Sequence, residues 1–225
     1  MRKTSLALAL VATAGLAAVP GPATAAKKAK LLPNCAAKKS KTIAQSADGR
    51  IYRIGTDAYA CSFKANKRFF LGDTDECQNQ SRVGDFRFGK GIVGYIDSSC
   101  GLESGDESIV VRSLRTGKIV NSGSPVDRVG GGESSTEISS WGMKPNGSIA
   151  WAGRNYGFVT GPGSPTAPPE LRQVWKREVG ADGVKLDEGA DIVGGSVAVG
   201  TSDFTTGLAP VYWANGTTLK SATLR

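Results

Sequence analysis

The pentapeptide Gly147-Ser148-Ile149-Ala150-Trp151 shows the pattern that decides the fold, a glycine followed closely by a short apolar run. Similar glycine-led runs begin at Gly49, Gly91 and Gly195, and successive glycines are separated by 42, 56 and 48 residues. Each run is followed by a second apolar stretch, a turn and a third stretch. Four short strands in about 40–50 residues, with a hairpin turn between the last two, are typical of a β-propeller blade. The spacing therefore predicts four blade-like units over residues 42–225.

The expected strands are short and are separated by Gly, Asn-Gly and Asp-Gly turns. They are rich in Val, Ile, Tyr, Phe and Trp, which favour pleated strands. After the first 25 residues, no window has sustained helical spacing of apolar residues free of Gly or Pro, so we expect almost no helix. In the last unit the expected strands are Asp191–Gly194, Val197–Thr201, Pro210–Ala214 and Leu219–Leu224.

The fold class that follows is all-β, with about four blade-like, four-stranded antiparallel sheets arranged as in a β-propeller. A two-sheet β-sandwich uses the same strands and turns and is the alternative.

Two segments resemble repeats of known propellers. Ser140–Trp151 is similar to the Pro-Asp-Gly-x-Ile-Ala-aromatic repeat of TolB-like and WD40-like β-propellers, with Asn146 where those repeats usually have Asp. Leu114–Lys118 is similar to the Asp-x-x-Thr-Gly-Lys turn of propeller blades, with Ser113 and Leu114 in place of the usual Asp. The resemblance covers two of the four units. It implies a scaffold for contacts with proteins or ligands and no particular chemistry.

The first 25 residues have the features of a secretory signal peptide. Arg2 and Lys3 give a positive start, Leu6–Val19 is a short apolar run, and Ala23-Thr24-Ala25 matches a small-x-small cleavage signal. We expect cleavage between Ala25 and Ala26. The run is shorter than the ~20 residues of a membrane span, and no later stretch is apolar enough. We therefore expect a bacterial protein, secreted or at the cell envelope, with no membrane span in the mature chain.

Export places the four cysteines in an oxidising compartment, where disulfides are expected. Four cysteines allow three pairings, and the sequence alone does not choose among them. Cys35 precedes the first expected strand and Cys61 lies on a strand of the same unit, whereas Cys77 and Cys100 flank loops of the second unit. We therefore predict the pairs Cys35–Cys61 and Cys77–Cys100. No pair has CxxC spacing and the chain has no His, so no metal site is expected.

The net charge of the chain is +8, and much of the excess lies in Lys27, Lys28, Lys30, Lys38, Lys39 and Lys41. These lysines form either a solvated linker or a basic arm that touches anionic polymers or lipid headgroups. No aromatic residue is interleaved with them, so bases have no stacking platform and no nucleic acid partner is expected. The expected organisation is a signal peptide (1–25), a basic N-terminal linker (26–41) and one propeller-like domain (42–225).

The absence of histidine excludes an imidazole base, a Ser-His-Asp relay and a His-ligated metal. The chain also lacks the glycine motifs that bind nucleotides, and we expect no cofactor. A pair of carboxylates about 5–10 Å apart could still cleave glycosides. Most of the candidate acids border turns, where Asp commonly accepts local backbone hydrogen bonds. The candidates are Asp73, Asp75, Glu76, Asp97, Asp187, Glu188, Asp191 and Asp203.

Four tryptophans, Trp141, Trp151, Trp175 and Trp213, could stack on sugars. Trp151 and Trp213 occur at comparable points of their units, which favours packing between blades instead. The function expected first is a non-catalytic binding or scaffold protein, with no catalytic residue, whose partner is a protein or an anionic envelope polymer. A secreted glycan-active hydrolase or lyase that uses rim carboxylates is the alternative. A purely structural envelope component is the third possibility.

Overall fold

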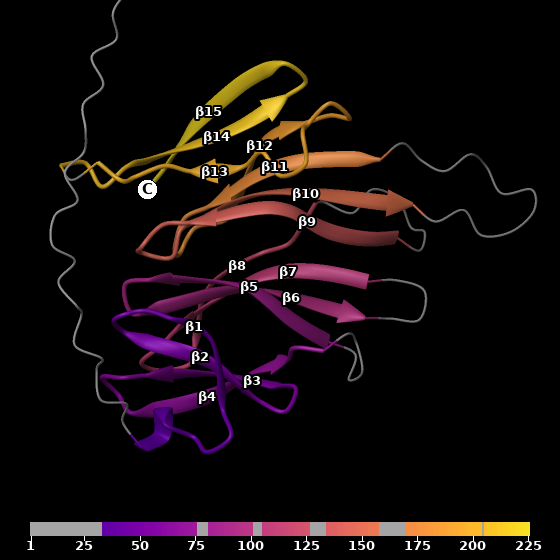
Figure 1. Ribbon diagram of the computed structural model, residues 1–225. Coiled ribbons are helices and arrows are strands. Elements are labelled where there is room, and N and C mark those ends of the chain that lie inside the picture. The colour runs from indigo at the N-terminus through magenta and orange to yellow at the C-terminus, as the bar shows by residue number, and fades with distance from the viewer. Residues whose placement is uncertain (1–32, 76–80, 101–104, 127–133, 158–169, 204) are drawn as a thin grey trace, which may run out of the picture. The chain divides into compact units, whose positions relative to one another are not determined.

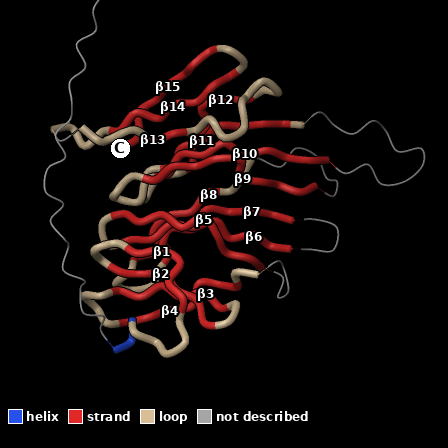
Figure 2. The backbone as a smooth tube through the Cα atoms, in the orientation of Figure 1, coloured by secondary structure: helices blue, strands red, loops and turns tan. Residues whose placement is uncertain are grey.

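The computed structural model describes residues 33–75, 81–100, 105–126, 134–157, 170–203 and 205–225. Strands dominate these residues (Figure 2), and their helical content is the 3-10 helix η1 (Pro33–Cys35). The expectation of almost no helix is confirmed for this part of the chain. The expected signal peptide, with its cleavage site at Ala25 and Ala26, lies outside the described residues, and so do residues 26–32 of the expected linker.

The strands form four successive antiparallel meanders, which we call the first to fourth sheets (Figure 1). The first sheet consists of β1 (Lys41–Gln45), β2 (Gly49–Ile54), β3 (Asp57–Ser62) and β4 (Lys67–Asp73). The second consists of β5 (Ser81–Gly89), β6 (Ile92–Cys100), β7 (Gly105–Ser113) and β8 (Ile119–Gly123). The third consists of β9 (Ser134–Met143), β10 (Ile149–Gly157), β11 (Leu171–Arg177) and β12 (Gly183–Glu188). The fourth consists of β13 (Ala198–Val199), β14 (Ala209–Asn215) and β15 (Thr218–Leu224).

The predicted all-β fold of blade-like antiparallel sheets is confirmed, with two differences in detail. A single parallel bridge between Asp106 of β7 and Thr136 of β9 joins the second and third sheets into one hydrogen-bonded sheet. The fourth sheet has three strands, because the strand expected at Asp191–Gly194 is reduced to an isolated bridge between Ile192 and Asn215. Gly195 adopts a φ of 82°, a left-handed conformation that extended strands do not contain.

Each sheet packs its apolar residues against the next sheet in chain order. Between the first and second sheets, a cluster includes Ile51, Leu71, Val93 and Tyr95. Between the second and third, a cluster includes Ile109, Val111, Ile149 and Trp151. Between the third and fourth, a cluster includes Ala150, Val174, Val211 and Leu224. Successive residues of β10 thus face opposite neighbours, as the two-residue period of a strand buried on both faces requires.

Tryptophans fill the spaces between these sheets. Trp151 and Trp213 are 3% and 4% exposed, which agrees with their interpretation as packing residues, and Trp141 is 2% exposed as well. The indole of Trp151 lies so close to Gly123 that a Cβ atom there would be 2.9 Å from its ring. Only glycine leaves room for this contact, so Gly123 is required by packing rather than by its backbone angles.

The N-terminal segment is fastened to the first sheet. Cys35 of η1 forms a disulfide with Cys61 of β3, with the Cα atoms 5.5 Å apart, and both residues are fully buried. The predicted Cys35–Cys61 pair is therefore confirmed. Cys77 lies outside the described residues, and its pairing with Cys100 stays a prediction.

Candidate functional site

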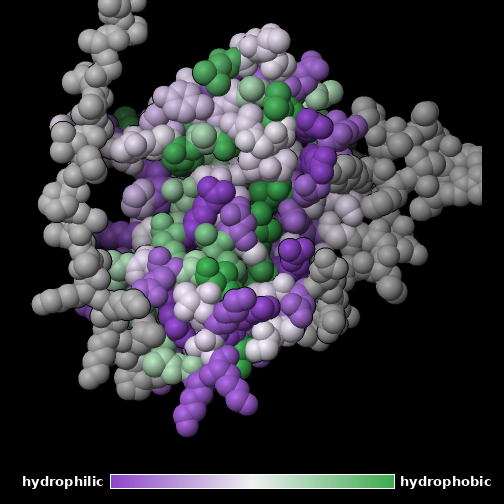
Figure 3. All heavy atoms as spheres, in the orientation of Figure 1, coloured by the Kyte–Doolittle hydropathy of each residue, from purple (hydrophilic) through white to green (hydrophobic). Residues whose placement is uncertain are grey.

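The first sheet and the segment before it carry most of the uncompensated charge. Residues 33–75 contain eight Lys or Arg and four Asp, whereas residues 189–225 contain two of each sign. Six of the eight cations are exposed, and hydrophilic side chains protrude at the β1–β4 end of the molecule (Figure 3). These six, which together we call the basic surface, lie before β1 and at its start (Lys38, Lys39 and Lys41) and in β4 and the turn before it (Lys64, Lys67 and Arg68).

Within the described residues, none of the cations of the basic surface lies within ion-pair distance of a carboxylate. The Arg68 guanidinium instead lies 5.4 Å from the centre of the Tyr59 ring. Exposed cations without ion-pair partners give this part of the molecule a positive potential.

Of the two remaining arginines of the first sheet, Arg50 has a structural role and Arg53 is half-buried. Arg50 is 5% exposed, it lies 4.4 Å from the centre of the Tyr52 ring, and it donates hydrogen bonds to the hydroxyls of Thr42 and Ser40. Burial lowers the pKa of Arg50, against the opposing effect of Tyr52. Arg50 thus ties β2 to β1 and is not available to a ligand.

The cations of the third sheet are paired. Arg154 donates two hydrogen bonds to Glu137, of 3.0 and 2.6 Å, and Arg172 donates one of 2.9 Å to Glu170. Lys176 pairs with Glu178, and Lys185 pairs with Glu188. These pairs neutralise the surface of the third sheet, so the basic character of the molecule is concentrated at the first sheet.

Most of the candidate carboxylates have local structural roles. Asp73 accepts hydrogen bonds from the Thr56 hydroxyl and from the backbone N–H of Asp75. Asp203 accepts hydrogen bonds from the Thr205 hydroxyl and from the backbone N–H groups of Thr206 and Thr205, and these bonds lower its pKa to about 2. Both residues are turn aspartates of the expected kind.

Asp187 and Glu188 are also occupied. Asp187 Oδ2 accepts hydrogen bonds from Trp213, Asn215 and Lys220, which all belong to the fourth sheet. Glu188 accepts from Gln173 and Lys185. Asp191 is exposed, and Glu76 lies outside the described residues.

Asp97 is the candidate that lies in a pocket. It lines a pocket of about 370 Å³ together with Asp106, Glu107, Ser108 and Thr136, among others. Burial raises the pKa of Asp97, against the opposing charge of Arg112. Asp97 is opposite Ser108, so Asp106 is its diagonal neighbour on the same face, at a Cβ separation of roughly 7 Å. The sequence analysis missed Asp106 because only the register of β6 and β7 brings the two together.

Trp175 is the tryptophan that remains partly accessible. It lines a hollow of about 190 Å³ with Ser122 and Arg177, and its ring lies nearly parallel to that of Trp151, with the centres 6.3 Å apart. Its indole N–H donates to Gln173. The sugar-stacking alternative therefore rests on this one indole.

None of the helices in the described residues is long and apolar enough to cross a membrane. In the same part of the chain, no group of three or more Cys, Asp or Glu side chains is arranged to hold a metal ion.

No known family model matches the chain, and no curated protein matches it. Among solved structures, the chain is similar to the N-terminal domain of Nup159, with a TM-score of 0.30 and 8% sequence identity. The match covers 81% of this chain and 43% of that chain, so this chain spans less than half the length of that structure. The propeller-like description therefore rests on the sheets themselves.

Proposed function

We propose that this protein is a secreted, non-catalytic binding protein that attaches to an anionic polymer at the cell envelope or outside the cell. The observation that carries the proposal is the basic surface, because its six exposed cations have no ion-pair partner among the described residues. The signal-like N-terminus supplies the route of export, and the buried Cys35–Cys61 disulfide suits an oxidising compartment.

The binding is electrostatic, so it weakens as salt rises. Exposed charges are screened beyond about 8–10 Å at physiological ionic strength. The propeller-like stack keeps the cations of β4 and the turn before it on a rigid sheet, which lowers the entropy lost when a polymer binds across them.

The test measures binding of the purified protein to long-chain polyphosphate and to polygalacturonate at low and at physiological salt. The first variant replaces Lys64, Lys67 and Arg68 with Gln. We expect its affinity to fall about tenfold or more at low salt, because three unpaired charges leave the contact area.

The matched control replaces Arg154, Lys176 and Lys185 with Gln, which removes the same charge from two lysines and one arginine of the third sheet. We expect less than a threefold loss, because these cations are already neutralised by neighbouring carboxylates. Equal losses in both variants would show that net charge alone attracts the polymer. Absence of binding by the unchanged protein would end the proposal.

A second candidate function is cleavage of a polysaccharide, favoured by the placement of Asp97 and Asp106 in one pocket with the pKa of Asp97 raised by burial. A raised pKa and a separation in the 5–10 Å range suit a general acid beside a second carboxylate. The check is release of reducing ends from polygalacturonate by the protein and by its Asp97→Asn variant. Activity that the substitution abolishes would replace the binding proposal with this one.

A further inference from the structure

Two like charges face each other at the edge of the first sheet. Lys41 of β1 and Arg53 of β2 are direct partners in the antiparallel register. Direct partners leave the same face of a sheet with Cβ atoms about 5 Å apart, and like charges in this arrangement are destabilising. Within the described residues, neither side chain has an ion-pair partner. The protein therefore holds an uncompensated repulsion at this point.

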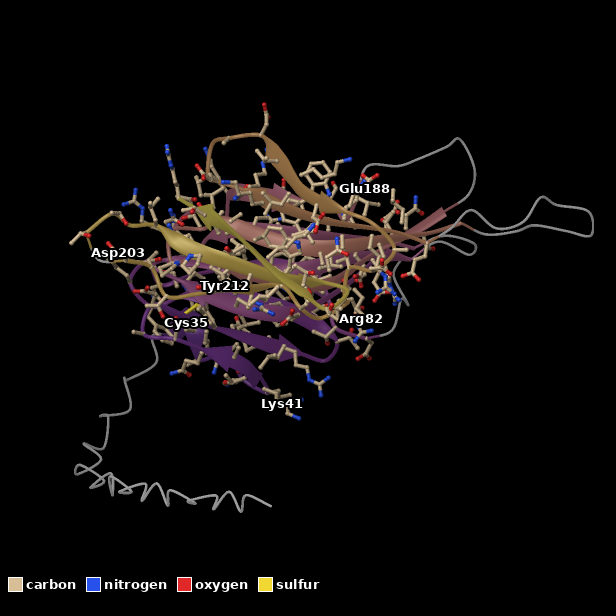
Figure 4. All side chains as sticks on the ribbon, turned by 90° about the horizontal axis from the view of Figure 1, so that it is seen from above. Cys35, Lys41, Arg82, Glu188, Asp203 and Tyr212 are labelled. Carbon is tan, nitrogen blue, oxygen red and sulfur yellow. A yellow bond between two sulfur atoms is a disulfide. The ribbon has the colours of Figure 1, made fainter. Side chains whose placement is uncertain are left out.

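Both side chains line the same hollow. It has a volume of about 460 Å³ and lies between β1 and β2 of the first sheet and β5 of the second, with Thr42, Thr74 and Gly84 also in its wall. Lys41 is exposed and projects from the edge of the molecule, clear of the ribbon (Figure 4), whereas Arg53 is half-buried. The two cations thus line one hollow, Arg53 half-buried and Lys41 exposed.

The acid in the wall of this hollow is engaged elsewhere. Asp85 Oδ2 accepts a hydrogen bond from the indole N–H of Trp141 and forms an ion pair of 3.2 Å with Arg87. Asp85 adopts a φ of 45°, which is uncommon for a residue other than glycine, and it lies within the β-bulge of β5. Its carboxylate therefore belongs to the contact between β5 and β9 and leaves the cations unneutralised.

The chemistry of the two cations suits an anion. A guanidinium offers a planar fork of donors, and an ammonium offers a mobile point charge. Together these groups match the several oxygens of one small oxyanion.

We propose that the hollow between Lys41 and Arg53 binds a single oxyanion, a phosphate or a carboxylate carried by the polymer. The inference rests on the proposed function for the source of this group and adds a defined anchoring point to a diffuse basic surface. Binding of the anion relieves the repulsion between the two cations, so part of the affinity comes from the strain of the unliganded sheet edge.

The test compares two double variants with pyrophosphate as the probe. One replaces Lys41 and Arg53 with Gln, and the control replaces Arg115 and Lys118 with Gln, which removes one arginine and one lysine from exposed positions of the β7–β8 turn, outside the hollow. We expect calorimetric titration to give at least a tenfold weaker affinity for the first variant and less than a threefold change for the control. Equal effects in the two variants would overturn the proposal.

A second measurement uses stability without any ligand. We expect Lys41→Gln to raise the melting temperature at low salt by about 1 °C, because it removes a like-charge pair, and to abolish the further rise that pyrophosphate causes in the unchanged protein. A lower melting temperature that pyrophosphate still raises normally would contradict the proposal.

Polymer binding separates this inference from the proposed function. If the Lys64, Lys67 and Arg68 variant loses polymer binding while the Lys41 and Arg53 variant loses no more than its control, the basic surface stands and the anchoring point fails. If the unchanged protein binds neither polymer, the proposed function fails, and the pyrophosphate titration still decides whether the hollow binds anions. Comparison of polyphosphate with polygalacturonate shows whether a phosphate or a carboxylate is the group accepted.

Discussion

The two ends of the chain are fastened to the fold in different ways. The first sheet packs on the second through an apolar cluster and is tied to the N-terminal segment by the Cys35–Cys61 disulfide. The fourth sheet packs on the third with polar side chains that cross between them. Asp187 accepts from three fourth-sheet side chains, and Lys144 Nζ donates to the backbone carbonyls of Gly207 and Leu224.

This difference explains where unpaired charge is tolerated. Between the third and fourth sheets, Asp187 and Lys144 add polar contacts to the apolar cluster. On the third sheet, Arg154, Lys176 and Lys185 pair with carboxylates. In the first sheet, a covalent bond and apolar packing supply the stability. Its exposed lysines and Arg68 form no ion pair among the described residues, whereas the buried Arg50 ties β2 to β1. Variants that remove the disulfide of the first sheet or the polar contacts of the fourth sheet test this difference.

The largest expected effect is at the first sheet, on removal of the disulfide. Replacing both Cys35 and Cys61 with Ala opens a loop whose ends are separated by 26 residues, and the chain-entropy account gives a loss of about 3 kcal/mol. Urea unfolding measures the loss. Hydrogen exchange should accelerate in β1–β4 more than in β14 and β15, which serve as the internal control. Uniform acceleration would contradict separate fastening.

At the fourth sheet, the next effect comes from Lys144, which is 4% exposed. We expect Lys144→Met to cost about 2 kcal/mol, because the carbonyl groups of Gly207 and Leu224 lose their donor while the apolar stem is kept. Lys118→Met, at an exposed position of the second sheet, is the matched control and should change the free energy of unfolding by less than about 0.5 kcal/mol. Similar values for the two variants would show that Lys144 does not stabilise the contact between the third and fourth sheets.

Acid should weaken the contact between the third and fourth sheets, because it protonates Asp187. Burial acts to raise its pKa, but the hydrogen bonds from Lys220, Trp213 and Asn215 outweigh burial and lower the pKa to about 2. A carboxyl group whose pKa is lower in the folded state than its ordinary value of 3.8 stabilises the fold above that value, and the contribution is lost as the pH falls toward 2. With the Lys220 side chain 40% exposed and screened by solvent, we expect about 1–2 kcal/mol.

The measurement is urea unfolding at intervals between pH 5 and pH 2 for the protein and for Asp187→Asn. The difference in stability between them should shrink across this range, since asparagine does not titrate. A difference that stays constant with pH would mean that the charge of Asp187 contributes nothing.

The sequence was sufficient for the repeating units and insufficient for their details. The glycine-led runs predicted the meanders because a tight turn and a two-residue apolar period are local properties. The inner strand of the fourth unit was overestimated, because Ile192 and Val197 are buried by side-chain packing without a continuous ladder. Apolar residues alone do not distinguish these two ways of being buried.

The candidate sites depend on register, which no local pattern determines. Lys41 meets Arg53 because of a turn and a bulge between Thr42 and Ala44, and a shift of one residue would place the two cations on opposite faces. Asp97 meets Asp106 through the register of β6 and β7. The sequence did identify the excess of lysine near the N-terminus, but which cations lack partners follows from the fold.

The smallest expected effect compares one paired cation with one unpaired cation. Arg154→Gln removes the hydrogen bonds to Glu137 and a 3.6 Å ion pair with Glu170, and we expect a loss of about 0.5 kcal/mol that diminishes as salt rises. Lys64→Gln removes a charge that only repels its neighbours, so at low salt it should leave stability unchanged or raise it slightly. Unfolding is measured at 20 mM and 500 mM salt, where the screening length is roughly 20 Å and 4 Å. The change in stability between the two salt concentrations gives one slope for each variant. Because screening weakens attraction and repulsion alike, the two variants must approach the unchanged protein from opposite sides as salt rises. Slopes of the same sign would mean that the charges of the first and third sheets stabilise the fold in the same way.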